Sequence, residues 1–263
     1  SLEQQIWSPL LAENEMANES REAVLAKLAL NPRYTARFAE TFDEGLTERT
    51  LGRVLAAYQR ALLSGDSPFD RWHFGREESV ANGYTALAAR GFAVFQEKGC
   101  AACHRIQDSS ALFTDGQFHN TGTGYLRAGR ALRPPSVQLA PGIFVVPTVD
   151  AETETFTDDG RYEVTGREAD KWRYRTPSLR NVALTGPYMH DGSIATLEAV
   201  VAFYAEGGGG DPAQDPRTRS VQLTQSDQEA LVAFLMTLTS SHVDVLVSDA
   251  RSVKIGERTA GGQ

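Results

Sequence analysis

Cysteine is scarce in this sequence, and its scarcity excludes one class of protein. The 263 residues include two cysteines, Cys100 and Cys103, which lie three positions apart. A disulfide framework needs more pairs at longer spacing, so we exclude a small disulfide-stapled fold. The five histidines are scattered, and no two of them have the spacing of zinc ligands on one helix.

Long apolar runs and a signal-peptide pattern are also absent from these residues. No stretch approaches the roughly 20 apolar residues that cross a bilayer, so we expect no membrane span. The chain begins at Ser1, without an initiator methionine or a signal-peptide pattern. We therefore expect that processing or truncation has removed a preceding segment.

Positive charge is in deficit. Lys and Arg number 26 against 34 Asp and Glu, which gives a net charge of −8 at pH 7. This balance argues against nucleic acid or an anionic membrane as a partner and suits a neutral or basic partner protein. A hydrophobic content of 41% and a charged content of 23% are typical of an ordinary soluble globular protein.

The first third of the chain has the apolar periodicity of helices. Ser20 is placed to cap one helix, which Pro32 ends, and Thr47 is placed to cap a longer one. A third helix is predicted near residues 84–97, with Gly91 in its apolar stripe. A glycine there lets a bulky group approach the helix backbone closely.

The middle of the chain predicts loops and the C-terminal part predicts helices. Residues 114–166 are rich in Gly, Pro and Thr, with two short strands expected at 143–146 and 162–164. Helices are expected after Thr196 and over residues 225–238. The tail after Ser240 has little pattern and is compatible with a strand, an arm or disorder.

The segment Cys100-Ala-Ala-Cys103-His104 matches the C-x-x-C-H signature of covalent haem attachment. Two thiols at this spacing can bond the two vinyl groups on one porphyrin edge, while the next imidazole reaches the iron. A redox dithiol usually opens a helix after a strand, whereas this segment closes a helix. Zinc would need two further ligands nearby. We therefore predict one haem c at Cys100, Cys103 and His104.

The sequence pattern alone does not identify the second axial ligand of that haem. Single-haem cytochromes commonly use methionine, and Met189 and Met236 lie downstream of the attachment site. Tyr204 lies on the inward face of a short predicted helix and competes with them. An inward tyrosine is more often a core residue than a ligand.

Several blocks resemble the di-haem cytochrome c peroxidase and MauG family. They are RTPSLRNVALTGPYMHDGS at residues 175–193, SLEQQ at 1–5 with Glu15-Met16, SPFD at 67–70 and FHN at 118–120. Together they cover most of residues 1–240 in the family's order. The family has two haem domains with a calcium site between them, a peroxidatic haem and an electron-transfer haem.

The resemblance selects among the axial ligands. In this family the ligand opposite the second haem's histidine lies fourteen residues after the histidine of the PYxHDG block, and here that position is Tyr204, after His190. Peroxidases have methionine there and MauG has tyrosine. The resemblance thus implies His104 and Tyr204 as the iron ligands, with Met189 as a packing residue.

A tyrosine ligand favours the MauG-like branch. Phenolate is a hard anionic donor that lowers the haem potential relative to thioether, so the haem accepts electrons poorly from an ordinary donor cytochrome. We expect a periplasmic MauG-like di-haem enzyme that uses hydrogen peroxide to oxidise a residue of a partner protein or an electron donor. The alternatives are a cytochrome c peroxidase and, if the chain is complete, a mono-haem electron-transfer cytochrome.

The resemblance also implies two further sites. Thr185 and Pro187 correspond to residues that offer backbone carbonyls to calcium, a hard cation that prefers oxygen. Gln5, Pro9 and Glu15 correspond to the peroxide site, where a carboxylate can move a proton between the peroxide oxygens during O–O cleavage.

The expected fold is mainly α, loop-rich and with a short β-hairpin. Residues 1–80 are predicted to be the remaining helical part of a cytochrome c-like peroxidatic domain, 81–240 a cytochrome c-like domain with the electron-transfer haem, and 241–263 a C-terminal tail. A complete family member has another C-x-x-C-H before the segment that begins this chain. We therefore expect a second haem on a missing segment.

Overall fold

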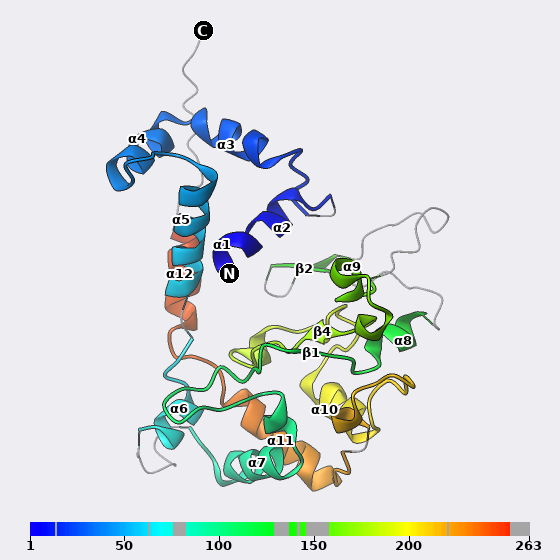
Figure 1. Cartoon of the computed structure of the whole chain (residues 1–263). Coiled ribbons are helices and arrows are strands. Elements are labelled where there is room, and N and C mark those ends of the chain that lie inside the picture. The colour runs from blue at the N-terminus through cyan, green and yellow to red at the C-terminus, as the bar shows by residue number, and fades with distance from the viewer. Residues whose placement is uncertain are drawn as a thin grey trace. The chain divides into compact units, whose positions relative to one another are not determined.

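The computed structural model describes residues 1–13, 15–62, 64–75, 83–128, 137–140, 143–145, 158–219 and 221–252. The chain forms two compact units, Ser1–Leu63 and Ser64–Gln263, each treated by itself below. Helices predominate in both units (Figure 1). Within the described ranges, no helix is long and apolar enough to cross a membrane.

The first unit consists of helices whose starts are set by capping side chains. Ser20 Oγ accepts a hydrogen bond from Ala23 N–H, and Thr47 and Thr50 form a capping box, as the sequence predicts. A small core of Ile6, Trp7, Val24 and Leu51 joins these helices. They are α1 (Leu2–Gln5), α2 (Trp7–Leu11), α3 (Arg21–Ala29), α4 (Pro32–Thr41) and α5 (Glu48–Ala61).

The second unit has short helices, two pairs of strands and long connections. The strands are antiparallel in both pairs, β1 with β4 and β2 with β3. Its elements are α6 (Pro68–His73), α7 (Ala86–Glu97), η2 (Cys100–Ala102), β1 (Phe118–His119), α8 (Thr123–Ala128), β2 (Val137–Ala140), β3 (Ile143–Val145), α9 (Tyr162–Thr165), η3 (Glu168–Asp170), β4 (Tyr174–Arg175), η4 (Val182–Leu184), α10 (Leu197–Ala205), η5 (Pro216–Thr218), α11 (Gln225–Met236) and α12 (Val243–Ser252).

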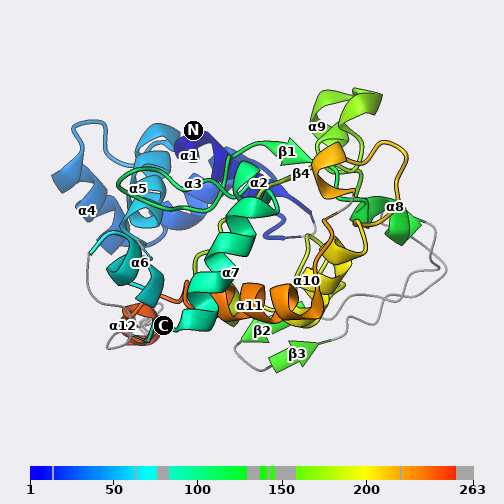
Figure 2. The same cartoon turned by 90° about the horizontal axis from the view of Figure 1, so that it is seen from below.

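Helices α7 and α11 cross at close range in this unit (Figure 2). Gly91 of α7 faces the backbone of α11, and a Cβ atom at this position would overlap the carbonyl oxygen of Ala230 and come within 2.8 Å of Phe234 Cβ. The bulky group that Gly91 admits is therefore the neighbouring helix. The crossing fixes the end of α7, which leads directly into Cys100.

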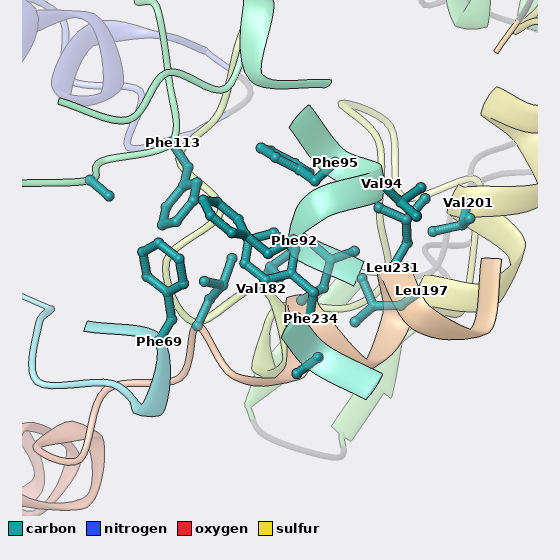
Figure 3. Packing of buried hydrophobic residues seen from close by; sticks show 14 of the residues in the cluster. Phe69, Phe92, Val94, Phe95, Phe113, Val182, Leu197, Val201, Leu231 and Phe234 are labelled. Carbon is teal, nitrogen blue, oxygen red and sulfur yellow. The ribbon is translucent and has the colours of Figure 1, made fainter. Parts of the chain in front are cut away.

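Aromatic rings fill the core around this crossing (Figure 3). Phe69 and Phe234 are fully buried, and their ring centroids lie 5.6 Å apart in an edge-to-face arrangement. Phe92, Phe95 and Phe113 complete the cluster. Such pairs contribute about 0.5–1.5 kcal/mol each beyond the area that they bury.

A largely buried ion pair ties α6 to this core. Arg180 donates two hydrogen bonds to the carboxylate of Asp70, at 2.6 and 2.7 Å, and a third to the Ala111 carbonyl. Burial raises the pKa of Asp70, but the hydrogen bonds from Arg180 and Ser67 outweigh it and hold the pKa below its usual value. The sequence analysis assigns residues 1–80 to one domain. In the structure the boundary between the two compact units follows Leu63, and Phe69 packs in the core of the second unit.

One of the two strand predictions is wrong. Residues 162–164 form helix α9 and not a strand, because the Arg161 carbonyl accepts the N–H groups of Val164 and Thr165 and Gly166 ends the turn with φ +63°. The other strand prediction is confirmed for Ile143–Val145, which forms β3 and pairs with β2. Val146 lies outside the described residues.

The segment after Ser240 also differs from the expectation. It forms α12, in which Val243, Leu246 and Val247 recur at the i, i+3, i+4 spacing of one helix face. The sequence pattern there is short and flanked by polar residues, which is why its helical period is weak.

Candidate functional site

The C-x-x-C-H segment forms a tight turn at the end of α7. Gly99, with φ +82°, leaves the helix in the left-handed region that glycine adopts without strain. The Cys100 carbonyl then accepts the N–H groups of Cys103 and His104, at 3.3 and 3.0 Å. This turn brings both thiols and the imidazole to the wall of one cavity.

His104 is held in one orientation by a backbone carbonyl. Its Nδ1 lies 2.8 Å from the Phe113 carbonyl oxygen, which can only accept, so Nδ1 carries the proton. The other nitrogen, Nε2, then has the free lone pair that a metal needs. Burial lowers the pKa of His104, which favours the neutral imidazole.

The cavity has a volume of about 400 Å³, within the range of small-molecule and cofactor sites. Much of its wall is apolar, with side chains from α7, α10 and α11. Burial in this wall raises the pKa of the Cys100 thiol to about 11 and also raises that of Cys103. Both cysteines are therefore neutral thiols at neutral pH in the protein alone, and they form no disulfide.

Tyr204 reaches the same cavity from the last turn of α10. Burial raises the pKa of Tyr204 to about 12, so the free phenol is protonated at neutral pH. Met189 also lines the cavity, whereas Met236 is 55% exposed and is not among its lining residues. The structure thus brings together His104, Tyr204 and Met189 and leaves Met236 outside.

The donor set of this cavity fits a c-type haem. Two thiols three residues apart adjoin a histidine whose tautomer is fixed, and a second oxygen or sulfur donor lies in the same apolar cavity. The residues expected at a calcium site, Thr185 and Pro187, line this cavity too, in the segment after η4.

The residues expected at a peroxide site belong to the first unit. Gln5 ends α1, Pro9 lies in α2, and Glu15 is exposed in the turn that follows. The Pro9 carbonyl accepts the Met16 N–H at 3.2 Å, which fixes the turn beside Glu15. These three residues and those of the cavity lie in different units.

One polar cluster beside the cavity wall is not recognisable from the sequence. His119 lies between two carboxylates, with Nε2 2.9 Å from Asp115 Oδ2 and Nδ1 2.9 Å from Asp215 Oδ2. Arg217 donates to Asp215 at 2.6 Å. Burial raises the pKa of Asp115, but hydrogen bonds from Gln117 and His119 outweigh it and bring the pKa to about 2. The FHN block contains His119, but Asp215 is 96 positions away, so sequence spacing cannot reveal this cluster.

Comparisons with known proteins identify the family. A family model described as di-haem cytochrome c peroxidase matches residues 1–78. The methylamine utilization protein MauG of Methylorubrum extorquens is 37% identical over 241 residues, which cover 90% of this chain and 58% of that protein. The MauG of Paracoccus denitrificans is 30% identical over 288 residues, which cover 96% of this chain and 69% of that protein.

A solved structure agrees with these relatives. The crystal structure of a MauG-like protein associated with microbial copper homeostasis has a TM-score of 0.64 and 28% identity, covering 92% of this chain and 69% of that one. The chain belongs to the di-haem cytochrome c peroxidase and MauG family, whose members are haem-dependent peroxidases and oxidases with haem c. The expectation of a mainly α, cytochrome c-like fold is confirmed. The chain spans 58% of the length of the Methylorubrum relative.

Proposed function

We propose that this chain is part of a periplasmic MauG-like di-haem oxidoreductase, which uses hydrogen peroxide to oxidise a partner-protein residue or an electron donor. The observation that carries the proposal is the meeting of Cys100, Cys103, His104 and Tyr204 in one cavity. Family membership supports the haem chemistry, and the tyrosine favours the MauG-like branch.

In the proposed site, the thiols of Cys100 and Cys103 would hold a haem covalently through its vinyl groups, and His104 Nε2 would bind its iron. The Phe113 carbonyl keeps the imidazole oriented through Nδ1. The bound haem supplies an iron that exchanges electrons one at a time. The chain's own contribution is the orientation of that iron and the exclusion of water by the apolar wall.

Tyr204 is proposed as the second protein ligand of that iron. A free phenol with a pKa of about 12 would have to lose its proton to bind as phenolate, and the charge of the iron would provide that driving force. A phenolate ligand would stabilise the higher iron charge and lower the haem potential. Such a haem would suit the storage of oxidising equivalents better than the acceptance of electrons from a donor cytochrome.

Two supporting sites belong to the same proposal. Glu15 would move a proton between the peroxide oxygens, with Gln5 and Pro9 beside it, at a second haem carried outside this chain. Thr185 and Pro187 would offer carbonyl oxygens to calcium. The spacing of these residues, which matches the family, is what supports both assignments.

Two alternatives make different predictions. By the resemblance, a cytochrome c peroxidase is expected to have methionine at the position of Tyr204, and a mono-haem electron carrier would need no peroxide site. The single C-x-x-C-H among the 263 residues is the observation that favours the electron carrier.

The number of haems in the native protein distinguishes these functions. We would combine the pyridine haemochrome assay with intact-protein mass and low-temperature electron paramagnetic resonance. Our proposal predicts two haems per molecule, one high-spin and one low-spin. One low-spin haem on a protein with the mass of these 263 residues would favour the electron carrier and remove the roles of Gln5 and Glu15.

A further inference from the structure

A series of aromatic rings in the second core leads away from His104. Figure 3 shows Phe69, Phe95 and Phe113 of this series. The Phe113 carbonyl receives the His104 hydrogen bond, and the Phe113 ring lies 5.3 Å from that of Phe69, centroid to centroid. Phe95 lies 6.4 Å from the His104 ring. The next ring beyond Phe69 is the indole of Trp72, at 6.2 Å.

Trp72 ends this series in a stacked pair. Its ring lies 4.3 Å from that of Tyr84, with an interplanar angle of 17°, and Phe92 meets it edge-on at 5.6 Å. Tyr84 is fully buried, whereas Trp72 is half-buried and reaches solvent. The pair therefore joins the aromatic core to the surface of the second unit.

The two rings differ in how easily each gives up an electron. A tyrosine must release its proton on oxidation, and the Tyr84 hydroxyl donates a long hydrogen bond, at 3.5 Å, to the Ala88 carbonyl, which is a weak acceptor for that proton. Burial also raises the pKa of Tyr84, which opposes proton release. An indole can lose an electron first, and the electron-rich face of a stacked phenol stabilises the resulting cation, as in other cation–π contacts.

We propose that Trp72 is the electron-entry site for the haem held by His104, connected through Phe69 and Phe113 and stabilised by Tyr84. Phenylalanine rings are not oxidised under these conditions, so they serve as the bridging medium. The inference rests on the proposed function, since peroxide is the oxidant that draws electrons along this route.

The electrons balance over two passages through Trp72. Hydrogen peroxide takes two electrons and two protons and becomes two water molecules. For each electron, the Trp72 indole becomes a radical cation and then regains its electron from a one-electron donor at the surface. Without a donor, the radical loses the indole proton to solvent. A second one-electron oxidation and the addition of water then give hydroxytryptophan, so that one hydrogen peroxide molecule accepts both electrons and the oxygen atom comes from water.

The test maps oxidised residues on the haem-loaded protein. Hydrogen peroxide is added without an electron donor, and peptide mass spectrometry then locates oxygenated tryptophan. We expect oxygenation at Trp72 above that at Trp172, which is also half-buried and packs against Tyr125. In the double variant Cys100→Ala, Cys103→Ala, which lacks attached haem, the Trp72 product is lost. Equal oxygenation of both tryptophans, or an undiminished Trp72 product without haem, overturns the proposal.

A second measurement does not depend on peroxide. A photogenerated ruthenium(III) polypyridyl complex oxidises the ferrous protein from solvent, and the rate of haem oxidation is followed by absorbance. Trp72→Phe is expected to slow this rate severalfold, and Phe69→Leu, which keeps Trp72 but interrupts the path, also slows it. Trp172→Phe is the matched control and leaves the rate unchanged.

The two experiments separate the failure of the relay from that of the proposed function. If the haem spectrum does not respond to peroxide but the photochemical rate falls in Trp72→Phe, the relay stands and the peroxide chemistry is wrong. If peroxide reacts and the rate is the same in Trp72→Phe as in wild type, Trp72 is a core residue only. Circular dichroism on each variant confirms that the helices are retained.

Discussion

The crossing of α7 and α11 gives the most direct prediction about stability, through the substitution Gly91→Ala. The added Cβ would overlap the Ala230 carbonyl, which belongs to a helix backbone and cannot move aside as a side chain can. Overpacking of this kind costs about 1–3 kcal/mol, and a backbone clash belongs at the upper end. The gain from replacing a helical glycine by alanine, about 0.5–1 kcal/mol, offsets part of it. We expect a net loss of about 2 kcal/mol in the free energy of unfolding.

Urea unfolding, followed by absorbance of the haem in the second unit, measures this loss. With a denaturant slope of about 2 kcal/mol per molar, the midpoint falls by roughly 1 M. The matched control is Gly65→Ala, because a Cβ at Gly65 meets nothing within 4 Å. Its midpoint should equal or slightly exceed that of wild type. A midpoint for Gly91→Ala at or above wild type would refute the account of the crossing.

Three further predictions concern charge, attachment and catalysis. Hydrogen bonds hold the pKa of Asp70 below its unfolded value of about 3.9, so the pair with Arg180 stabilises the fold above that pH and the stability is lost as pH falls through the lower folded pKa. Asp70→Asn should weaken the fall of the unfolding free energy at acid pH, and an unchanged pH dependence would contradict the stabilising role of the Asp70–Arg180 pair. Cys100→Ala with Cys103→Ala should abolish haem staining after denaturation, and retained stain would exclude covalent attachment there. Glu15→Gln should slow peroxide-driven oxidation while leaving the spectrum of the haem at His104 unchanged; full activity would remove Glu15 from the peroxide site.

Local features of the fold were predictable from the sequence. Ser20, Thr47 and Thr224 begin helices because a hydroxyl three residues before a free backbone N–H caps it whatever the rest of the fold does. Helix α9 was not predictable, because its four residues are too few to show an apolar periodicity. Its turn depends on the Arg161 carbonyl and on Gly166.

The candidate site was predictable only where residues are adjacent in the chain or match the family. Cys100, Cys103 and His104 form one motif, so their chemistry is readable locally. The ligand role of Tyr204 was predicted from the family resemblance, since nothing in the neighbouring sequence distinguishes an inward-facing ligand tyrosine from a core tyrosine. His119 with Asp215 could not be found, because the chain brings them together only on folding.

The most direct test of the central claim is low-temperature electron paramagnetic resonance on the wild-type haem protein and on Tyr204→Phe. Phenylalanine keeps the ring and its packing and removes only the oxygen that would bind iron. We predict that covalent haem is retained, while the low-spin signal of the haem at His104 is lost or shifts to that of a different ligand set. An unchanged low-spin signal in Tyr204→Phe would contradict the pairing of His104 with Tyr204.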